Sequence, residues 1–200
     1  MKIGYLIIGR LKSTRLPNKL LIEIKGKPII SHLLDRLKLA KKVDEIIICT
    51  SSAEQDKPLA KIAKDNNVKC FFGDPDDVLI RMYDAANKYN LDYILTITAD
   101  SPFVDPVYAD AIVETYQKTK ADLIRQFDLP HGVFSYGIKV KALQKVIEIK
   151  DTSDTEVWGR YFTDTGIFNV VDFEVINKFH KRPGMRMTSD YPEDLKFFET

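Results

Sequence analysis

Cations and hydroxyl groups, with no acidic residue among them, follow the first apolar segment of the chain. Residues 3–8 are apolar and rich in β-branched side chains, which predicts a short buried strand. The residues that follow, GRLKSTRLPNK, contain Arg10, Lys12, Arg15 and Lys19. Exposed backbone N–H groups, arginine forks and a lysine point charge together suit a triphosphate. This segment is therefore the predicted phosphate site, and a solvated basic loop is the alternative.

Two carboxylates, Asp100 and Asp190, each end an apolar segment, YILTITAD and MRMTSD. Ligands of open α/β sheets bind at the carboxyl ends of the strands, so both carboxylates should lie at the edge that carries the cationic loop. Hard oxygen ligands suit Mg²⁺, and a divalent ion neutralises a triphosphate during nucleotidyl transfer. The alternative makes Asp190 a helix N-cap and Asp100 a turn residue.

The elements that must position these groups alternate between strand and helix patterns. Strands are predicted at 3–8, 45–50, 68–72, 93–98, 122–125 and 185–189, and helices at 28–41, 56–66, 77–89, 107–118 and 141–149, with a last helix after Asp190. Asp76 is the expected N-cap of the helix over 77–89. This alternation favours an α/β fold with a mostly parallel central sheet.

Length and composition limit the number of domains and the classes of partner that the chain can have. Two hundred residues fit a single domain, 1–200, and the looser pattern over 127–173 predicts an inserted lid and dimer surface. The balance of 30 basic and 29 acidic residues argues against a nucleic-acid partner, so an anion site must be local. Cys49 and Cys70 lie in apolar segments and are expected to be reduced core residues. No signal peptide or membrane span is recognisable, so a cytoplasmic protein without membrane insertion is expected.

The amino-terminal segment also carries a family resemblance. Its pattern, GRLKSTRLPNKLLIEIKGKPI, resembles the signature of the cytidylyltransferases that activate acylneuraminic and 3-deoxy-manno-octulosonic acids, nearest the spore-coat polysaccharide branch. TADSPFVDP and MTSDYPEDL resemble the two metal motifs of that family. The resemblance implies a three-layer α/β/α Rossmann-like nucleotidyltransferase fold, a homodimer, CTP and an acidic sugar as substrates, and Mg²⁺ held by Asp100 and Asp190.

The resemblance and the charge pattern together give a set of nucleotide-site residues. Lys19, Arg15 and Asp100 are the expected catalytic residues, since charge on the α-phosphoryl group must be stabilised from fixed positions. The expected nucleotide-binding residues are Ile8, Gly9, Arg10, Ser13, Arg15, Lys19, Ser51, Asp77, Arg81 and Ala99. For Asp77 and Arg81 the alternative is a helix cap with an i,i+4 pair, worth about 0.3–0.5 kcal/mol. Ser51 has a similar capping alternative.

The acceptor side is predicted from the region 127–173 and the residues just before it. Arg125, His131 and Arg160 are the expected substrate-binding residues, because arginine holds a carboxylate through two hydrogen bonds. His131 could instead be a surface residue, and the segment EVWGRY departs from the histidine-containing stretch expected there. The identity of the acceptor therefore stays open.

The function expected from these features is transfer of CMP from CTP to a sugar acid in surface-polysaccharide biosynthesis, with release of pyrophosphate. Three alternatives stay open at this point. The chain could transfer a nucleotide to a sugar or polyol phosphate, it could be a glycosyltransferase with the same sheet plan, or it could be a nucleotide-binding module without turnover.

Overall fold

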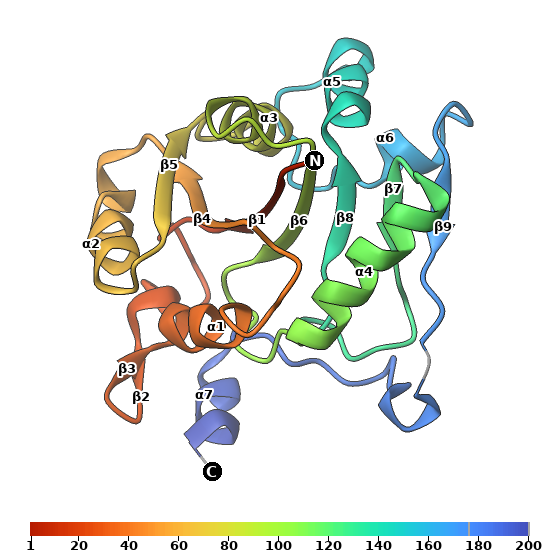
Figure 1. The fold of residues 1–200 in the computed structure, drawn as a ribbon. Helices are drawn as coiled ribbons and strands as arrows, with labels where there is room; N and C mark the ends of the chain where they lie inside the picture. The colour runs from red at the N-terminus through yellow and green to blue at the C-terminus, as the bar shows by residue number, and fades with distance from the viewer. Residues whose placement is uncertain (176, 200) are drawn as a thin grey trace.

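The chain forms a mostly parallel sheet with helices on both faces (Figure 1). The computed structural model describes residues 1–175 and 177–199. Within these residues the sheet has seven strands, in the spatial order β5 (Lys69–Gly73), β4 (Glu45–Ser51), β1 (Ile3–Ile8), β6 (Tyr93–Thr98), β8 (Tyr136–Lys139), β7 (Leu123–Arg125) and β9 (Val170–Asp172). β8 runs antiparallel to both of its neighbours, and the other pairings are parallel. The predicted α/β fold class is confirmed.

Side chains that alternate along the central strands build one apolar layer on each face. Tyr5 and Ile7 of β1 face the helices α1 (Ile29–Leu37), α2 (Pro58–Asp65) and α4 (Pro106–Thr119). Leu6, between them, faces α3 (Val78–Lys88), α5 (Val140–Ile149) and α6 (Arg160–Thr163). This period of two is the geometry of an extended strand buried on both faces. Figure 1 shows the resulting three layers, with α1 and α4 below the sheet and α3 and α5 above it.

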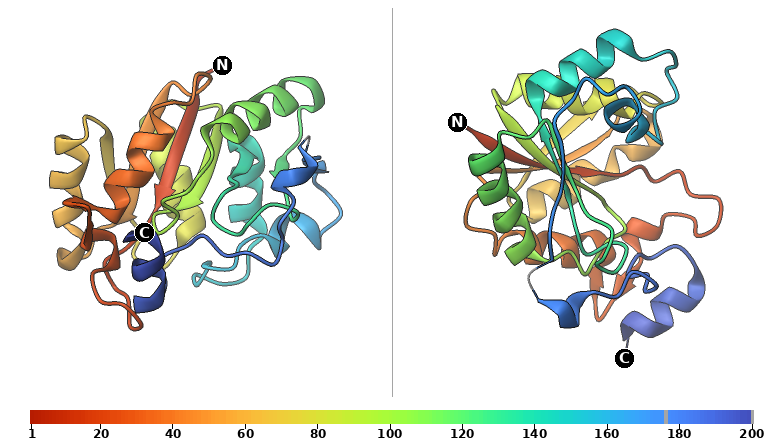
Figure 2. Two further views of the ribbon diagram at one scale, coloured as in Figure 1. Left: turned by 90° about the horizontal axis from the view of Figure 1, so that it is seen from below. Right: turned by 90° about the vertical axis from the view of Figure 1, so that its right-hand side faces the viewer.

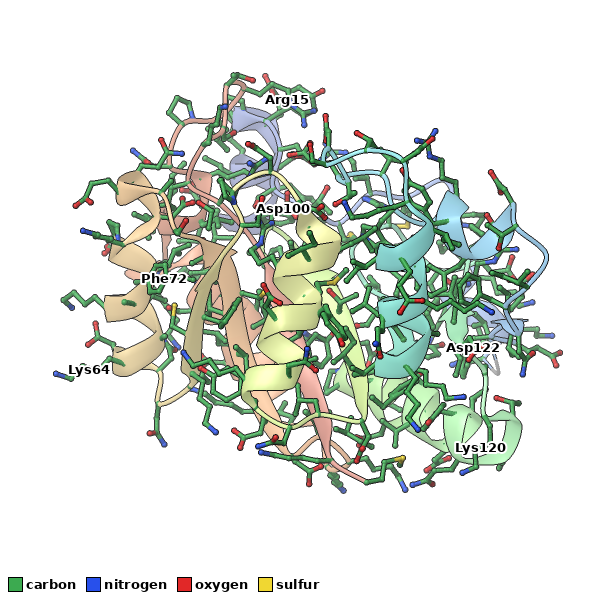
Figure 3. All side chains as sticks on the ribbon, turned by 90° about the horizontal axis from the view of Figure 1, so that it is seen from above. Arg15, Lys64, Phe72, Asp100, Lys120 and Asp122 are labelled. Atoms are coloured by element: carbon green, nitrogen blue, oxygen red, sulfur yellow. The ribbon has the colours of Figure 1, made fainter. Side chains whose placement is uncertain are left out.

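The parallel direction of β1, β4 and β6 brings their carboxyl ends to one edge of the sheet. In Figure 3 the labelled Arg15 and Asp100 lie toward this edge, whereas Lys120 lies toward the opposite end. Several short elements follow the edge: η1 (Lys19–Leu21), the hairpin of β2 (Glu23–Ile24) and β3 (Lys27–Pro28), η2 (Glu54–Asp56), η3 (Lys178–His180) and α7 (Pro192–Glu199). Figure 2 shows α7 beside the segment that follows β1, where it contacts β2.

The predicted strand over 185–189 is wrong. This segment crosses the sheet edge instead of joining it, with a single isolated bridge between His131 and Arg186. Its backbone N–H groups are satisfied by two different loops, because Met187 donates to the His131 carbonyl at 2.8 Å and Ser189 donates to the Asp100 carbonyl at 2.8 Å. The strand-like sequence pattern therefore belongs to a segment whose backbone is hydrogen-bonded to two loops, one containing His131 and the other containing Asp100.

Two predicted helix boundaries also need correction. α1 ends at Leu37, before the predicted Lys41. The backbone N–H groups of Leu39 and Ala40 donate to carbonyls three residues back, and those of Lys41 and Lys42 donate to the Asp110 carboxylate. The N-cap of α3 is Asp77 rather than Asp76, since the Asp77 side chain accepts from the Ile80 N–H at 3.1 Å.

Part of the region 127–173 belongs to the central sheet. It supplies β8, which lies between β6 and β7, and β9 at the edge, together with α5 and α6. Its predicted role as a lid and dimer surface stays a prediction. Among the described residues, no helix has the length and apolar character needed to cross a membrane.

A buried ion pair anchors this region to the start of α3. The Asp77 carboxylate is 1% exposed and lies 2.5 Å from Nζ of Lys150. Thr155 Oγ1 donates to the same carboxylate at 2.8 Å and accepts from the Leu79 N–H at 3.1 Å. Removing one partner of such a pair leaves an uncompensated buried charge, which is strongly destabilising.

We therefore expect Asp77→Ala to lower the free energy of unfolding by about 3–5 kcal/mol in urea denaturation. The neighbouring substitution Asp76→Ala is the matched control, because that carboxylate is mostly exposed, and its cost should stay within about 0.5 kcal/mol. Equal costs for the two substitutions would contradict the anchoring role of Asp77.

Candidate active site

A cavity of about 570 Å³ opens at the carboxyl edge of the sheet. Its walls come from the loop after β1, the end of β6, the start of α3 and the segments around residues 126–136 and 156–158. Many of the residues predicted from the sequence line it together: Ile8, Gly9, Arg10, Arg15, Lys19, Arg81, Ala99, Asp100, His131 and Asp190. The predicted cationic loop and both predicted carboxylates therefore meet in one cavity.

Lys19 lies between the two predicted metal-binding carboxylates. Its ammonium group forms an ion pair with Asp100 Oδ2 and lies 3.0 Å from Asp190 Oδ1. Burial disfavours the ammonium charge, but the two carboxylates outweigh it and raise the pKa of Lys19 above its ordinary value. Burial also opposes ionisation of Asp190, but hydrogen bonds from Thr188 and Lys19 hold its pKa below the usual range. Lys19 and Asp190 are thus both charged at neutral pH.

Local packing directs Lys19 into the cavity. Asn18 adopts a left-handed backbone conformation with φ 54°, which turns the chain into η1. The next residue after Lys19, Leu20, is buried in the core and fixes the short helix in place. Gly9 is required nearby, because a Cβ at this position would lie 2.5 Å from the Cβ of Ala99. The loops after β1 and β6 therefore approach closely, and this approach brings Lys19 to Asp100.

Asp190 faces the cavity and is not the cap of α7. Its carboxylate accepts hydrogen bonds from Thr188 Oγ1 at 2.7 Å and from Arg186 Nη1 at 3.2 Å. The backbone N–H groups of Asp190 and Tyr191 donate instead to the Asp194 carboxylate, at 2.7 and 2.9 Å. Asp194, in the first turn of α7, thus binds the backbone N–H groups that lead into the helix, while the Asp190 side chain is held by Thr188, Arg186 and Lys19.

Asp100 presents an oxygen atom that has no partner. Oδ1 is buried and accepts no hydrogen bond from any described residue, while Oδ2 contacts Lys19. A buried carboxylate oxygen without a donor is costly unless a cation or water satisfies it. The described residues contain no cluster of three or more His, Cys, Asp and Glu side chains that could hold a metal alone. Asp100 and Asp190 nevertheless fit Mg²⁺, because this ion keeps several waters and takes phosphate oxygens as ligands.

Both arginines of the loop after β1 have acidic partners. Arg15 donates to the Tyr191 hydroxyl at 2.9 Å, lies 3.4 Å from Asp190 and stacks on the Tyr191 ring, 5.0 Å from its centre. Arg10 contacts Glu156 and, at 3.4 Å, Asp76. Ser13 does not line the cavity; its Oγ accepts from the Leu16 N–H at 3.3 Å and shapes the turn.

Of three further residues that were predicted to bind the nucleotide, one lines the cavity and two lie outside its wall. Arg81 is 1% exposed and lines the cavity, where burial lowers the pKa of its guanidinium and its Nε has no partner among the described residues. Its Nη1 donates to the Asp74 and Pro75 carbonyls. Asp77 and Ser51 lie outside the cavity wall, since Asp77 caps α3 and pairs with Lys150, and Ser51 donates to Asp56.

On the acceptor side only His131, of the three predicted residues, lines the cavity. Arg125 pairs with Asp172 at 2.6 Å and lies over the Phe127 ring, while Arg160 lies over the Tyr161 ring. Neither arginine belongs to the cavity wall. Whether either one binds substrate stays a prediction.

Sequence reasoning missed much of the wall opposite the cationic loop. The missed residues of this wall are Thr96, Gln126 and Tyr136. Trp158, which was expected on the acceptor side, belongs to the same wall, and Glu156 lines the cavity where it contacts Arg10 of the loop. Thr96 Oγ1 and Gln126 Nε2 are buried and have no partner among the described residues, so both are available to a ligand. Gln126 could have been found by the rule that located Asp100, because it directly follows strand β7. The other residues come together only through the fold.

Comparison with known proteins gives a family match for this chain. Residues 5–200 match the model of the family described as "Cytidylyltransferase". The chain is 32% identical over 200 residues to an uncharacterized protein of Methanocaldococcus jannaschii, covering 99% of this chain and 82% of that protein. It is 24% identical to the spore coat polysaccharide biosynthesis protein SpsF of Bacillus subtilis, covering 97% and 83%. An 8-amino-3,8-dideoxy-manno-octulosonate cytidylyltransferase of Shewanella is 26% identical, covering 96% and 71%.

Solved structures share the fold. A cytidylyltransferase from Leptospira borgpetersenii superposes with a TM-score of 0.90 at 27% identity, covering 100% of this chain and 85% of that one. A CMP:2-keto-3-deoxy-manno-octonic acid synthetase, solved in complex with CTP, superposes with a TM-score of 0.79 at 16% identity, covering 100% and 97%. At that identity the second likeness concerns the fold alone.

Proposed function

The chain belongs to the cytidylyltransferase family, and we propose that it transfers CMP from CTP to a sugar acid with release of pyrophosphate. The observation that carries the proposal is the meeting of Lys19, Asp100 and Asp190 beside a cationic loop in one cavity. The relatives named for spore-coat polysaccharide and for 8-amino-3,8-dideoxy-manno-octulosonate support a sugar-acid acceptor and a role in surface-polysaccharide biosynthesis. We also propose a cytoplasmic homodimer, because CTP is a cytoplasmic substrate and the family resemblance implies a dimer.

In the proposed reaction the residues of the chain position phosphates and stabilise charge. The loop after β1 binds the triphosphate through Arg10 and Arg15. Lys19 stabilises the charge that develops on the α-phosphoryl group. Asp100 and Asp190 would hold Mg²⁺, which would neutralise charge on the triphosphate. An oxygen of the acceptor attacks the α-phosphorus in line, the bond to the β-phosphate breaks, and pyrophosphate leaves.

The wall opposite the loop is the proposed acceptor site. Tyr136 and Trp158 pack edge to face, with ring centres 5.2 Å apart, and offer an apolar surface to a sugar ring. Gln126 and His131 supply hydrogen-bonding groups beside this surface. Arg125 and Arg160 would have to leave their present contacts to reach an acceptor carboxylate.

The test is pyrophosphate release with a panel of nucleotides and acceptors in the presence of Mg²⁺. We expect release with CTP and a sugar acid, such as 3-deoxy-manno-octulosonate or its 8-amino derivative, and at most about a hundredth of that rate with UTP, GTP or ATP. Release that requires a sugar phosphate, or consumption of UDP-sugars without any nucleoside triphosphate, would contradict the proposal. Tight CTP binding without turnover of any acceptor would favour the nucleotide-binding module.

A further inference from the structure

Arg10 joins three segments at the mouth of the cavity. It belongs to the loop after β1, and its guanidinium contacts the Glu156 carboxylate, the Pro75 carbonyl and, at 3.4 Å, the Asp76 carboxylate. The Arg10 side chain is mostly buried by these contacts, at 19% exposed, although Glu156 is 62% exposed. The guanidinium that is proposed to grip phosphate is therefore already held by acidic groups of the protein itself.

Glu156 lies just beyond a firmly anchored point of its loop. Thr155 is fully buried and is hydrogen-bonded to Asp77 and to the backbone of α3. By contrast, the Glu156 carboxylate contacts Arg10, and the next residue, Val157, is 80% exposed. Residues 156–157 thus form an exposed tip on a fixed base. A tip of this kind can move when its one charged contact is lost, without disturbing the core.

Trp158 connects this tip to the acceptor wall. It lines the cavity and packs edge to face against Tyr136 and Phe162, with ring centres at 5.2 and 6.0 Å. It directly follows the exposed tip, so a displacement of Glu156 alters the surroundings of the indole ring. Trp158 is also the only tryptophan of the chain, so tryptophan fluorescence reports on the surroundings of this one ring.

A triphosphate and Glu156 compete for the same guanidinium. Both are anions, and Glu156 lines the cavity that the triphosphate would enter. An arginine fork cannot donate its strongest paired hydrogen bonds to both of them at once. An exposed ion pair is weak in water, whereas a triphosphate brings several charges, so the phosphates should win. The carboxylate would still weaken nucleotide binding, because its contact with Arg10 must first be broken.

We propose that Glu156 is an internal competitor for Arg10 that sets the affinity for the nucleoside triphosphate, and that phosphate binding releases the tip of the loop carrying Trp158. This inference rests on the proposed function, because it assumes that a triphosphate enters this cavity. Glu156 is in this sense an affinity-determining residue, and it couples occupancy of the phosphate site to the shape of the acceptor wall.

The test is titration of the wild-type protein and Glu156→Gln with CTP and Mg²⁺ in the absence of acceptor, by calorimetry and by Trp158 fluorescence. We expect Glu156→Gln to lower the Kd for CTP roughly fivefold, the size of one exposed ion pair. The emission of the free variant should differ from that of the free wild type, and in the same direction as the change that inorganic tripolyphosphate causes in the wild type. The matched control is Glu54→Gln, which removes an equal charge from an exposed residue of η2 paired with Lys57, and its Kd should stay within about twofold of wild type.

Equal Kd values for Glu156→Gln and Glu54→Gln would overturn the proposal, and so would wild-type Trp158 emission that stays constant at saturating CTP. Inorganic tripolyphosphate serves as a second probe that carries the phosphates without the base. If Glu156→Gln binds it more tightly but the wild type makes no CMP-sugar from any acceptor, the inference stands and the proposed function fails. Product formation together with unaltered binding by the variant would support the proposed function and overturn the role of Glu156.

Discussion

Replacing Asp100 by Asn is expected to reduce turnover at least about a thousandfold while leaving the fold intact. Asparagine keeps the shape of the side chain but removes the charge, and its amide nitrogen is a donor where the structure presents a buried carboxylate oxygen without a partner. A divalent ion then loses an anionic ligand next to the triphosphate. The measurement is steady-state pyrophosphate release with CTP, Mg²⁺ and an accepted sugar acid.

Two controls separate loss of chemistry from loss of structure. Urea denaturation should show Asp100→Asn within about 1–2 kcal/mol of wild type, because Lys19 keeps its second partner, Asp190. Asp65→Asn, an exposed carboxylate paired with Lys61 on α2, should keep wild-type turnover. If Asp100→Asn retained more than a tenth of the wild-type rate, Asp100 would not be a metal ligand in the reaction.

The second large effect is expected for Lys19→Ala, with a loss of about a hundredfold to a thousandfold carried mainly by kcat. The ammonium lies between Asp100 and Asp190, so its removal leaves two carboxylates facing each other and takes away the fixed charge beside the α-phosphoryl group. The pKa of Asp190, which Lys19 helps to hold down, should rise toward its ordinary value. The kinetic parameters and the NMR titration of the Asp190 carboxylate measure the two effects separately.

Lys12→Ala is the comparison for Lys19→Ala. Lys12 belongs to the same loop and lines the same cavity, but the structure gives its ammonium no carboxylate partner among the described residues. We expect Lys12→Ala to raise the KM for CTP less than about tenfold and to leave kcat near wild type. A smaller loss for Lys19→Ala than for Lys12→Ala would show that the loop supplies only general positive charge.

The sequence patterns predicted those parts of the fold that depend on short-range physics. β1 and β6 match their predicted bounds because a buried strand of a parallel sheet is a continuous apolar segment. The rule that ligands bind at the carboxyl edge of the sheet then correctly predicted that Lys19 lies near Asp100 and Asp190, although these acids are 81 and 171 positions further along the chain.

Other features could not be predicted because they depend on which loops meet. The segment around Arg186 has a strand-like pattern, but it lies across the sheet edge and its backbone pairs with loops. Arg125 was expected to bind the acceptor; it pairs with Asp172 of the neighbouring strand and lies outside the cavity wall, so its role in binding stays a prediction. Glu156 carries no motif at all, and its meeting with Arg10 follows from the long-range anchoring of its loop by Asp77.

We propose that Asp100 and Asp190, beside Lys19, hold a metal-bound nucleotide. Electron paramagnetic resonance of Mn²⁺, used in place of Mg²⁺, measures this directly in the presence and absence of CTP. We predict that CTP increases Mn²⁺ binding to the wild-type protein at least about tenfold, and that Asp100→Asn abolishes the increase while the folded protein still binds CTP. An equal CTP-dependent increase in the wild type and in Asp100→Asn would contradict the account.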